Sequence, residues 1–210
     1  SNMKSSGRSV AVLFADVAGS TRLYDAFGDT KAKLLVDECI DVMRTAVERA
    51  QGYVVKTIGD EVMAVMPDPE KAWAAAVDIQ FKMTELPAVD GHQRAVRIGF
   101  HAGFVIEVGG DVFGNTVNLA ARMTALAKGG QIMTTCATVL LLPKLAISER
   151  SNTRRACTTG VSAGTPGSTR VLFNAMRPSQ VSSGAEFCSS PCRQSSVTRA
   201  SRKAFSVRSV

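Results

Sequence analysis

The stretch "YVVKTIGDEVMAVM" at residues 53–66 decides the fold. Two apolar runs rich in strand-forming residues flank Gly59 and the adjacent acids Asp60 and Glu61, a pattern that predicts two strands joined by a tight turn. A plain hairpin needs no pair of carboxylates at its tip. We therefore expect one of these acids to hold a ligand, and the rest of the chain indicates which.

The segments on either side predict alternating strands and helices. Residues 9–17, "SVAVLFADV", form a short apolar run that ends beside an acid and predicts a buried strand. Residues 20–27 predict a short helix. A longer one follows, capped by Asp29 or Thr30, with apolar residues at three- and four-residue steps and Gly52 as its stop.

The residues after the hairpin complete the predicted order of strands and helices. A second long helix begins near Asp68 and ends before Pro87, residues 95–114 predict a strand or hairpin, 116–126 a helix and 131–135 a short strand. The order β-α-β-β-α-β predicts an α+β fold with a ferredoxin-like (palm-type) core. Such a core has one sheet, and we expect its helices to pack on one face.

The charge of the chain divides it in two. Its 210 residues carry a net charge of +7, which by itself would indicate a nucleic-acid or anionic-membrane partner. Residues 1–150, however, hold 16 Lys and Arg against 17 Asp and Glu, whereas residues 151–210 hold 9 against 1. We therefore predict one folded domain at 1–150, with no nucleic-acid or membrane partner. Residues 151–210 are a basic, Ser/Arg-rich tail, either disordered or non-native.

Cysteine use and hydropathy bear on the compartment. The five cysteines are an odd number without paired spacing, and the Cys188-x-x-x-Cys192 pair lacks the partners of a zinc site. No apolar run reaches the ~18–20 residues of a membrane span. A reduced, cytoplasmic setting is the simplest interpretation.

Two acids are candidates for a metal site. Asp16 closes the first strand and precedes the small, flexible segment "VAGST", which opens a helix whose main-chain N–H groups favour phosphate. In a ferredoxin-like sheet this strand lies beside the hairpin, so Asp16 and Asp60 converge on one edge. Two carboxylates together repel unless a divalent cation lies between them, and oxygen ligands suit Mg²⁺ or Mn²⁺. The alternative is two solvated acids in turns.

A second pair lies on the last predicted helix. Asn118 and Arg122 are four residues apart and therefore neighbours on one helix face. An amide and a guanidinium that point the same way suit a sugar oxygen and a phosphoryl oxygen. The alternative is a solvent-facing pair on an amphipathic helix.

Four segments together resemble a known family. "LFADVAGST", "VVKTIGDEVMAV", "IGFHAG" and "GDVFGNTVNLAARM" resemble, in order and approximate spacing, the class III adenylate and guanylate cyclase catalytic domain over roughly residues 9–142. The resemblance implies a role for each matching position. Asp16 and Asp60, with the main-chain carbonyl of Val17, would bind two Mg²⁺ or Mn²⁺ ions. Lys56 and Asp111 would recognise the purine. Asn118 would orient the ribose, and Arg122 would stabilise the α-phosphate in the transition state. Glu61 receives no ligand role.

The resemblance also implies a substrate and an assembly. A Lys donor and an Asp acceptor at positions 56 and 111 match adenine, whereas the family's guanylate forms generally carry an acid and a small polar residue there. The expected reaction converts ATP into 3′,5′-cyclic AMP and pyrophosphate. The family's site lies between two domains, and this chain has one copy of each residue set. It should therefore form a head-to-tail homodimer with shared active sites.

The ending departs from the family. A Gly-Lys stretch such as "VKGK", whose Lys contacts the triphosphate, usually follows, but here no Lys occurs between residue 150 and Lys203. The sheet is then expected to lack its last strand. Two alternatives stay open: a guanylate cyclase, and a catalytically silent cyclase-like domain for dimerisation or sensing. The absence of a "GGDEF" hairpin disfavours a diguanylate cyclase. Because such domains usually follow a sensor or membrane segment, a regulatory or membrane domain is expected elsewhere in the full-length protein.

Overall fold

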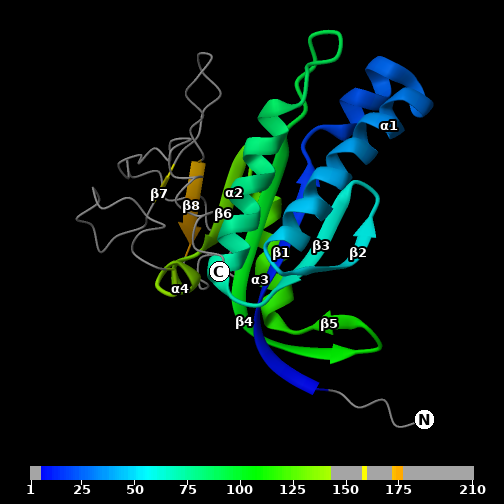
Figure 1. Cartoon of the computed structure of the whole chain (residues 1–210). Coiled ribbons are helices and arrows are strands. Elements are labelled where there is room, and N and C mark those ends of the chain that lie inside the picture. Colours follow the sequence, from blue (N-terminus) through cyan, green and yellow to red (C-terminus); the bar gives the residue numbers. More distant parts are fainter. Residues whose placement is uncertain (1–5, 143–157, 160–171, 177–210) are drawn as a thin grey trace.

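One mixed sheet forms the centre of the molecule (Figure 1). The computed structural model describes residues 6–142, 158–159 and 172–176. The strands are β1 (Ser6–Val17), β2 (Tyr53–Ile58), β3 (Glu61–Met66), β4 (Val96–Val108), β5 (Asp111–Phe113), β6 (Gln131–Thr135), β7 (Thr158–Thr159) and β8 (Leu172–Met176). The helices are α1 (Ser20–Arg49), α2 (Pro69–Glu85), α3 (Asn115–Leu126) and α4 (Cys136–Val139).

The strand order confirms the predicted fold class. The sheet runs β2-β3-β1-β4-β6-β8-β7, and β5 pairs with the far end of β4. Its first four strands are antiparallel to their neighbours, while β6 lies parallel to β4. The segment from β1 to β4 with its two helices is the β-α-β-β-α-β unit of a ferredoxin-like, α+β fold.

The β2–β3 hairpin forms as residues 53–66 predict. Gly59 sits in the turn with a φ of 61°, a left-handed conformation that glycine adopts without the steric cost of a Cβ. On β3, Val62, Ala64 and Met66 face one side of the sheet, and Met63 and Val65 face the other. Both faces of this central region are therefore covered.

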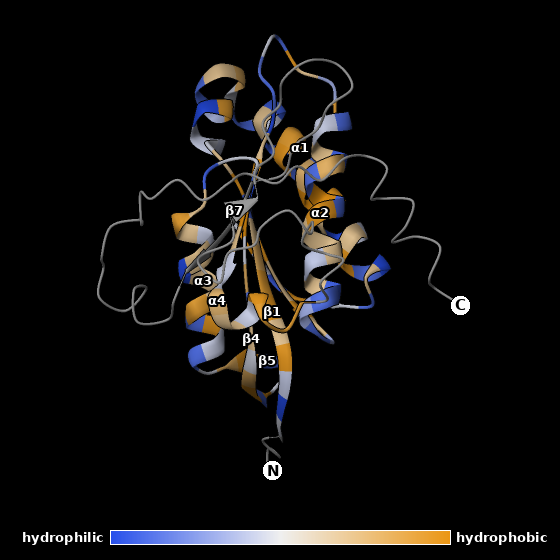
Figure 2. Ribbon diagram, turned by 90° about the vertical axis from the view of Figure 1, so that its left-hand side faces the viewer, coloured by the Kyte–Doolittle hydropathy of each residue, from blue (hydrophilic) through white to orange (hydrophobic). Residues whose placement is uncertain are grey.

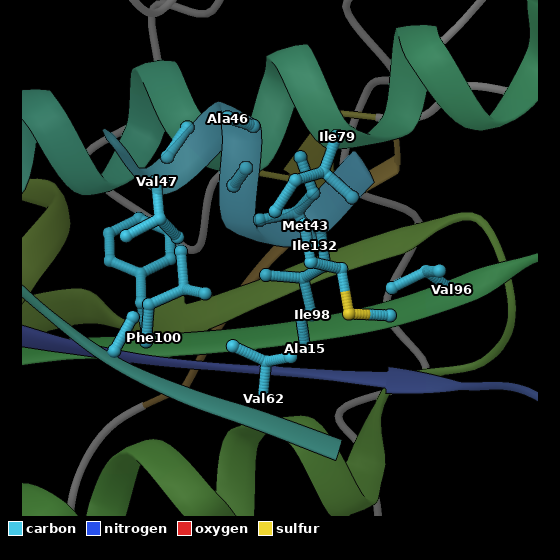
Figure 3. Packing of buried hydrophobic residues seen from close by; sticks show 14 of the residues in the cluster. Ala15, Met43, Ala46, Val47, Val62, Ile79, Val96, Ile98, Phe100 and Ile132 are labelled. Carbon is cyan, nitrogen blue, oxygen red and sulfur yellow. The ribbon is translucent and has the colours of Figure 1, made fainter. Parts of the chain in front are cut away.

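Helices α1 and α2 cover one face of the sheet. Met43, Ala46 and Val47 of α1 and Ile79 of α2 lie over the sheet residues labelled in Figure 3, which are Ala15, Val62, Val96, Ile98, Phe100 and Ile132. Met43 and Ile79 are fully buried. This layer is the main hydrophobic core and fixes the position of the sheet under the two helices.

The two helices of the β-α-β-β-α-β core, α1 and α2, lie on one face as expected, whereas α3, which follows that core in the chain, packs on the opposite face. Val10, Val12 and Phe14, which alternate with the core residues along β1, pack with Ala120 of α3. Figure 2 shows α3 on the other side of the strands from α1 and α2. The physical reason is that β1, β3 and β4 are apolar on both sides and need cover on both.

The helix ends agree with the sequence signals. Within α1, Gly28 has non-helical angles and separates a segment ending at Phe27 from the longer helix. The side chain of Asp68 accepts a hydrogen bond from the Lys71 N–H and caps α2, with Pro69 in its first turn. Among the described helices, none is long and apolar enough to span a membrane.

The sheet extends beyond β6, contrary to the expectation that its last strand is missing. Strand β8 lies parallel to β6, and β7 pairs with β8. Strand β8 lies within the apolar stretch "RVLFNAM" at residues 170–176. The predictions of disorder or a foreign sequence for the rest of the tail lie outside the described residues.

Candidate active site

Asp16 and Asp60 meet at one edge of the sheet. Asp16 is the penultimate residue of β1 and lies directly opposite Glu61 of β3. Asp60 occupies the adjoining β2–β3 turn, where its main-chain carbonyl accepts a hydrogen bond from the Val17 N–H at 3.3 Å. The structure thus brings together the two acids and the main chain of Val17.

The acids at this edge influence one another's ionisation. The side chain of Asp16 is only 8% exposed. Burial raises its pKa, the hydrogen bond from Arg97 lowers it, and the negative charge of Asp60 raises it further. The pKa of Glu61 is raised by burial and by the charge of Asp16, with Arg97 acting in the opposite direction. At this edge of the sheet, the negative charge of Asp16, Asp60 and Glu61 therefore exceeds the positive charge that Arg97 supplies.

The donor set fits a hard divalent cation. It offers carboxylate oxygens and a main-chain carbonyl, which Mg²⁺ and Mn²⁺ accept. The described residues contain no cluster of three or more His, Cys, Asp or Glu side chains that could enclose a metal by themselves. An ion held by this pair would need further oxygen ligands, which water supplies when no nucleotide is bound and which nucleotide phosphates can supply when one is.

Arg97 belongs to this edge and was not foreseen from the sequence. It lies on β4 directly opposite Asp16, and its Nε donates a hydrogen bond to Asp16 Oδ2 at 2.5 Å. Its Nη2 contacts the same oxygen. Only the antiparallel register between β1 and β4 reveals this neighbour, because the two residues are 81 positions apart.

Lys56 and Asp111 form a second pair, at the β2 and β5 strands. Lys56 Nζ lies 2.5 Å from Asp111 Oδ2, and Asp111 Oδ1 accepts a hydrogen bond from the Val112 N–H. The hydrogen bond from Lys56 lowers the pKa of Asp111. Their side chains are 41% and 32% exposed. The structure therefore places one charged donor and one charged acceptor side by side at the surface.

Asn118 and Arg122 lie on α3 and remain separate from the acids. Both are exposed and one helical turn apart on the same helix. In the described part of the chain, no hydrogen bond or ion pair joins either side chain to Asp16 or Asp60. One protomer thus presents the acid pair and the α3 pair as two unconnected groups.

The β4–β5 hairpin exposes large apolar side chains. Ile106 and Phe113 lie opposite each other on the two strands, and Phe104 is close by on β4. They are 44%, 51% and 59% exposed, respectively. This hairpin also carries Asp111 and leads directly into α3. The apolar surface therefore adjoins both the Lys56–Asp111 pair and the helix that carries Asn118 and Arg122.

The fold and these pairs define a nucleotide cyclase domain. The chain belongs to the family of adenylate and guanylate cyclase catalytic domains, whose pattern matches residues 3–162. The match extends past the predicted core of residues 9–142.

Two curated relatives carry the name adenylate cyclase. An adenylate cyclase of Streptomyces coelicolor is 37% identical over 120 residues, which cover 57% of this chain and 30% of that protein. A pH-sensitive adenylate cyclase of Mycobacterium tuberculosis is 32% identical over 126 residues, covering 60% and 30%. The chain thus spans about a third of the length of the curated relatives it matches.

A solved structure of similar fold carries the other name. The monomeric guanylyl cyclase domain of the RhoGC fusion protein from Blastocladiella emersonii aligns with a TM-score of 0.60 and 26% identity, over 76% of this chain and 92% of that domain. Family membership therefore leaves the choice between adenine and guanine to the residues of the site.

Proposed function

We propose that this domain converts ATP into 3′,5′-cyclic AMP and pyrophosphate at sites shared between two copies of the chain. The observation that supports adenine is the Lys56–Asp111 pair, in which Nζ and Oδ2 are 2.5 Å apart. The guanylate cyclase alternative lacks a comparable supporting observation.

The pair matches the hydrogen-bonding edge of adenine. Adenine offers a ring-nitrogen acceptor and an exocyclic amine donor next to each other. A Lys ammonium donates only, and an ionised Asp accepts only. Guanine presents a carbonyl acceptor where adenine has its amine, and Asp111 would then face an acceptor. Before a base enters, Lys56 and Asp111 neutralise each other.

The sheet edge that carries Asp16 and Asp60 would hold the divalent ions that cyclisation of ATP requires. Asp16, Asp60 and the Val17 carbonyl would bind two Mg²⁺ or Mn²⁺ ions. When bound, such ions lower the pKa of a hydroxyl nucleophile and neutralise phosphate charge. Asp16 contributes a carboxylate that the sheet holds in place, because it is buried and lies within β1.

The residues of α3 would act on the other side of the nucleotide. In the reaction the ribose 3′-oxygen forms a bond to the α-phosphorus, the bond from that phosphorus to the bridging oxygen breaks, pyrophosphate leaves and the hydroxyl proton is released. Asn118 would position the ribose for this attack. Arg122 would donate hydrogen bonds to the α-phosphate oxygens as their charge increases, a contribution commonly of about 10²–10³ in rate.

A head-to-tail homodimer would unite the two groups. The acid pair and the α3 pair each occur once in the chain and do not contact each other within the described part of one protomer. In a two-fold dimer the acids of one copy can face α3 of the other, which gives two equivalent sites. The exposed Phe104, Ile106 and Phe113 supply apolar surface that such a contact would cover.

One observation favours the silent-domain alternative. The sequence has no lysine between residue 150 and Lys203, so the usual Gly-Lys contact to the triphosphate has no counterpart there. A silent domain would keep the fold and the dimer yet form no cyclic nucleotide, whether supplied with ATP or GTP.

The deciding experiment measures Mn²⁺-dependent turnover of ATP and of GTP. We expect cyclic AMP from ATP, little cyclic GMP from GTP, and loss of activity in Asp60→Asn. The control is Asp90→Asn, an equivalent acid-to-amide change at an exposed loop residue whose partner is Lys31. Turnover of neither nucleotide, by a protein that is folded and dimeric, would establish the silent alternative instead.

A further inference from the structure

Among the described residues, the ion pair between Arg97 and Asp16 has no role assigned so far. Two donors of one guanidinium, Nε and Nη2, contact a single oxygen, Oδ2 of Asp16. No role in the proposed reaction explains this, and the residue was not among the predicted site residues. The contact nevertheless involves the acid on which the proposed metal site depends.

The sheet fixes this contact in place. Asp16 pairs in register with Glu61 on one side and with Arg97 on the other. Residues directly opposite one another on neighbouring strands point to the same face of the sheet. Glu61, Asp16 and Arg97 therefore form a row across three central strands, and the guanidinium lies beside the carboxylate because of the backbone register.

The charges of this row explain why the guanidinium stays there. Asp16 is buried and its nearest titratable neighbours besides Arg97 are the acids Asp60 and Glu61, which repel it. A buried carboxylate is unfavourable unless a cation or hydrogen-bond donors compensate it. In the absence of a metal, Arg97 supplies both the positive charge and the donors.

The two partners differ in their freedom to move. The Asp16 side chain is 8% exposed and that of Arg97 is 39% exposed. The long Arg stem can swing its charged end into solvent, whereas the short Asp side chain remains at the edge. If the pair separates, Arg97 is the partner that leaves.

We propose that Arg97 is an internal counter-ion that competes with divalent cations for Asp16. Oδ2 cannot offer the same electron pairs to a guanidinium and to a metal ion, so an ion that binds through this oxygen must displace the Arg97 contact. The inference rests on the proposed metal site. It adds that the chain's own cation sets the affinity of that site and stabilises the metal-free domain.

The test measures metal binding directly, without nucleotide or turnover. Isothermal titration with MnCl₂, together with thermal unfolding with and without Mn²⁺, is performed on the wild-type chain and on Arg97→Gln. Loss of charge-assisted hydrogen bonds to the carboxylate should tighten Mn²⁺ binding by about tenfold. The metal-free variant should unfold at a lower temperature than wild type, and added Mn²⁺ should raise its unfolding temperature by more.

A matched control separates this contact from general charge. Arg8 also lies on the sheet and forms an ion pair with Glu107, but it is at the opposite end of β1 from Asp16. Arg8→Gln removes the same charge and should leave Mn²⁺ affinity unchanged. Arg97→Lys keeps the charge with fewer donors and should bind Mn²⁺ with intermediate affinity, which provides a test should Arg97→Gln fail to fold.

The failures of the two proposals are distinguishable. If Asp16→Asn abolishes Mn²⁺ binding while Arg97→Gln leaves it unchanged or weaker, the competition is overturned and the metal site stands. If neither the wild type nor Arg97→Gln binds Mn²⁺, or Asp16→Asn binds as wild type does, the metal site and the competition are both overturned.

Discussion

At the scale of single residues, Lys56 and Asp111 are the residues proposed to decide which base the site accepts. Replacing them with Glu and Cys, as Lys56→Glu with Asp111→Cys, exchanges the donor for an acceptor and removes the carboxylate. The ratio of kcat/KM for ATP to that for GTP should fall by about 10- to 100-fold, because unpaired polar groups against adenine cost about 1–3 kcal/mol. Each single change leaves one charge without its partner and should reduce turnover of both nucleotides. Unchanged cyclic AMP formation by the double variant would contradict the base assignment.

The sequence predicts the neighbours of some residues and not of others. The sequence was enough to predict that Asp16 and Asp60 lie close together. Asp16 lies at the end of one strand, Asp60 adjoins another, and the predicted fold class makes these strands neighbours. Arg97 could not be foreseen. Its place opposite Asp16 depends on the register between β1 and β4. The local sequence "VRIGF" does not indicate that register. Sequence motifs therefore pointed to candidate site residues, whereas the cation beside Asp16 could be found only from the register of the sheet.

At the scale of elements, the position of α3 depends on a glycine of β4. A Cβ at Gly99 would overlap the main-chain nitrogen of Thr124 and lie 2.6 Å from the carbonyl carbon of Met123. Gly99→Ala should therefore push α3 away from the sheet and destabilise the domain by about 1–3 kcal/mol. Turnover should fall as well, since Arg122 lies on the displaced helix. Urea unfolding and initial rates measure the two effects.

A second variant tests the cause of that displacement. The Cβ would also overlap Oγ1 of Thr124, but the shortest contact is with the main-chain nitrogen, so adding Thr124→Ala to Gly99→Ala trims a side chain without removing the main-chain conflict. The double variant should be no more stable than Gly99→Ala alone. Recovery of stability would show that the Thr124 side chain, and not the helix backbone, sets the distance between α3 and β4.

The face on which α3 packs illustrates what element patterns leave open. The periodicity of residues 116–126 predicts a helix with one apolar side, but it does not say which face of the sheet that side covers. The continuous apolar run in residues 9–17 is the signal that both faces of β1 are buried. Gly99 has no side chain and so gives no hydrophobic signal, although a Cβ at this position would overlap the main chain of α3.

At the scale of the whole molecule, the proposed activity requires two chains, and mixing two defective variants tests this directly. Asp16→Ala removes a proposed metal-binding acid and Arg122→Ala removes the proposed transition-state cation, so each homodimer should be inactive. In an equimolar mixture that exchanges subunits, half of the dimers are mixed, and each mixed dimer has one complete and one doubly defective site. Activity should therefore recover to about a quarter of the wild-type value.

The control for this mixture is the double variant Asp16→Ala, Arg122→Ala combined with wild type. Its mixed dimers contain two singly defective sites, so activity should fall as the double variant is added, and the mixture of the two single variants should exceed the double variant alone. Size-exclusion chromatography must show that dimers form, and mass spectrometry of differently labelled chains must show that they exchange. If subunits exchange and the two single variants still yield no cyclic AMP, then Asp16 and Arg122 of different chains do not serve one nucleotide, and the shared site is wrong.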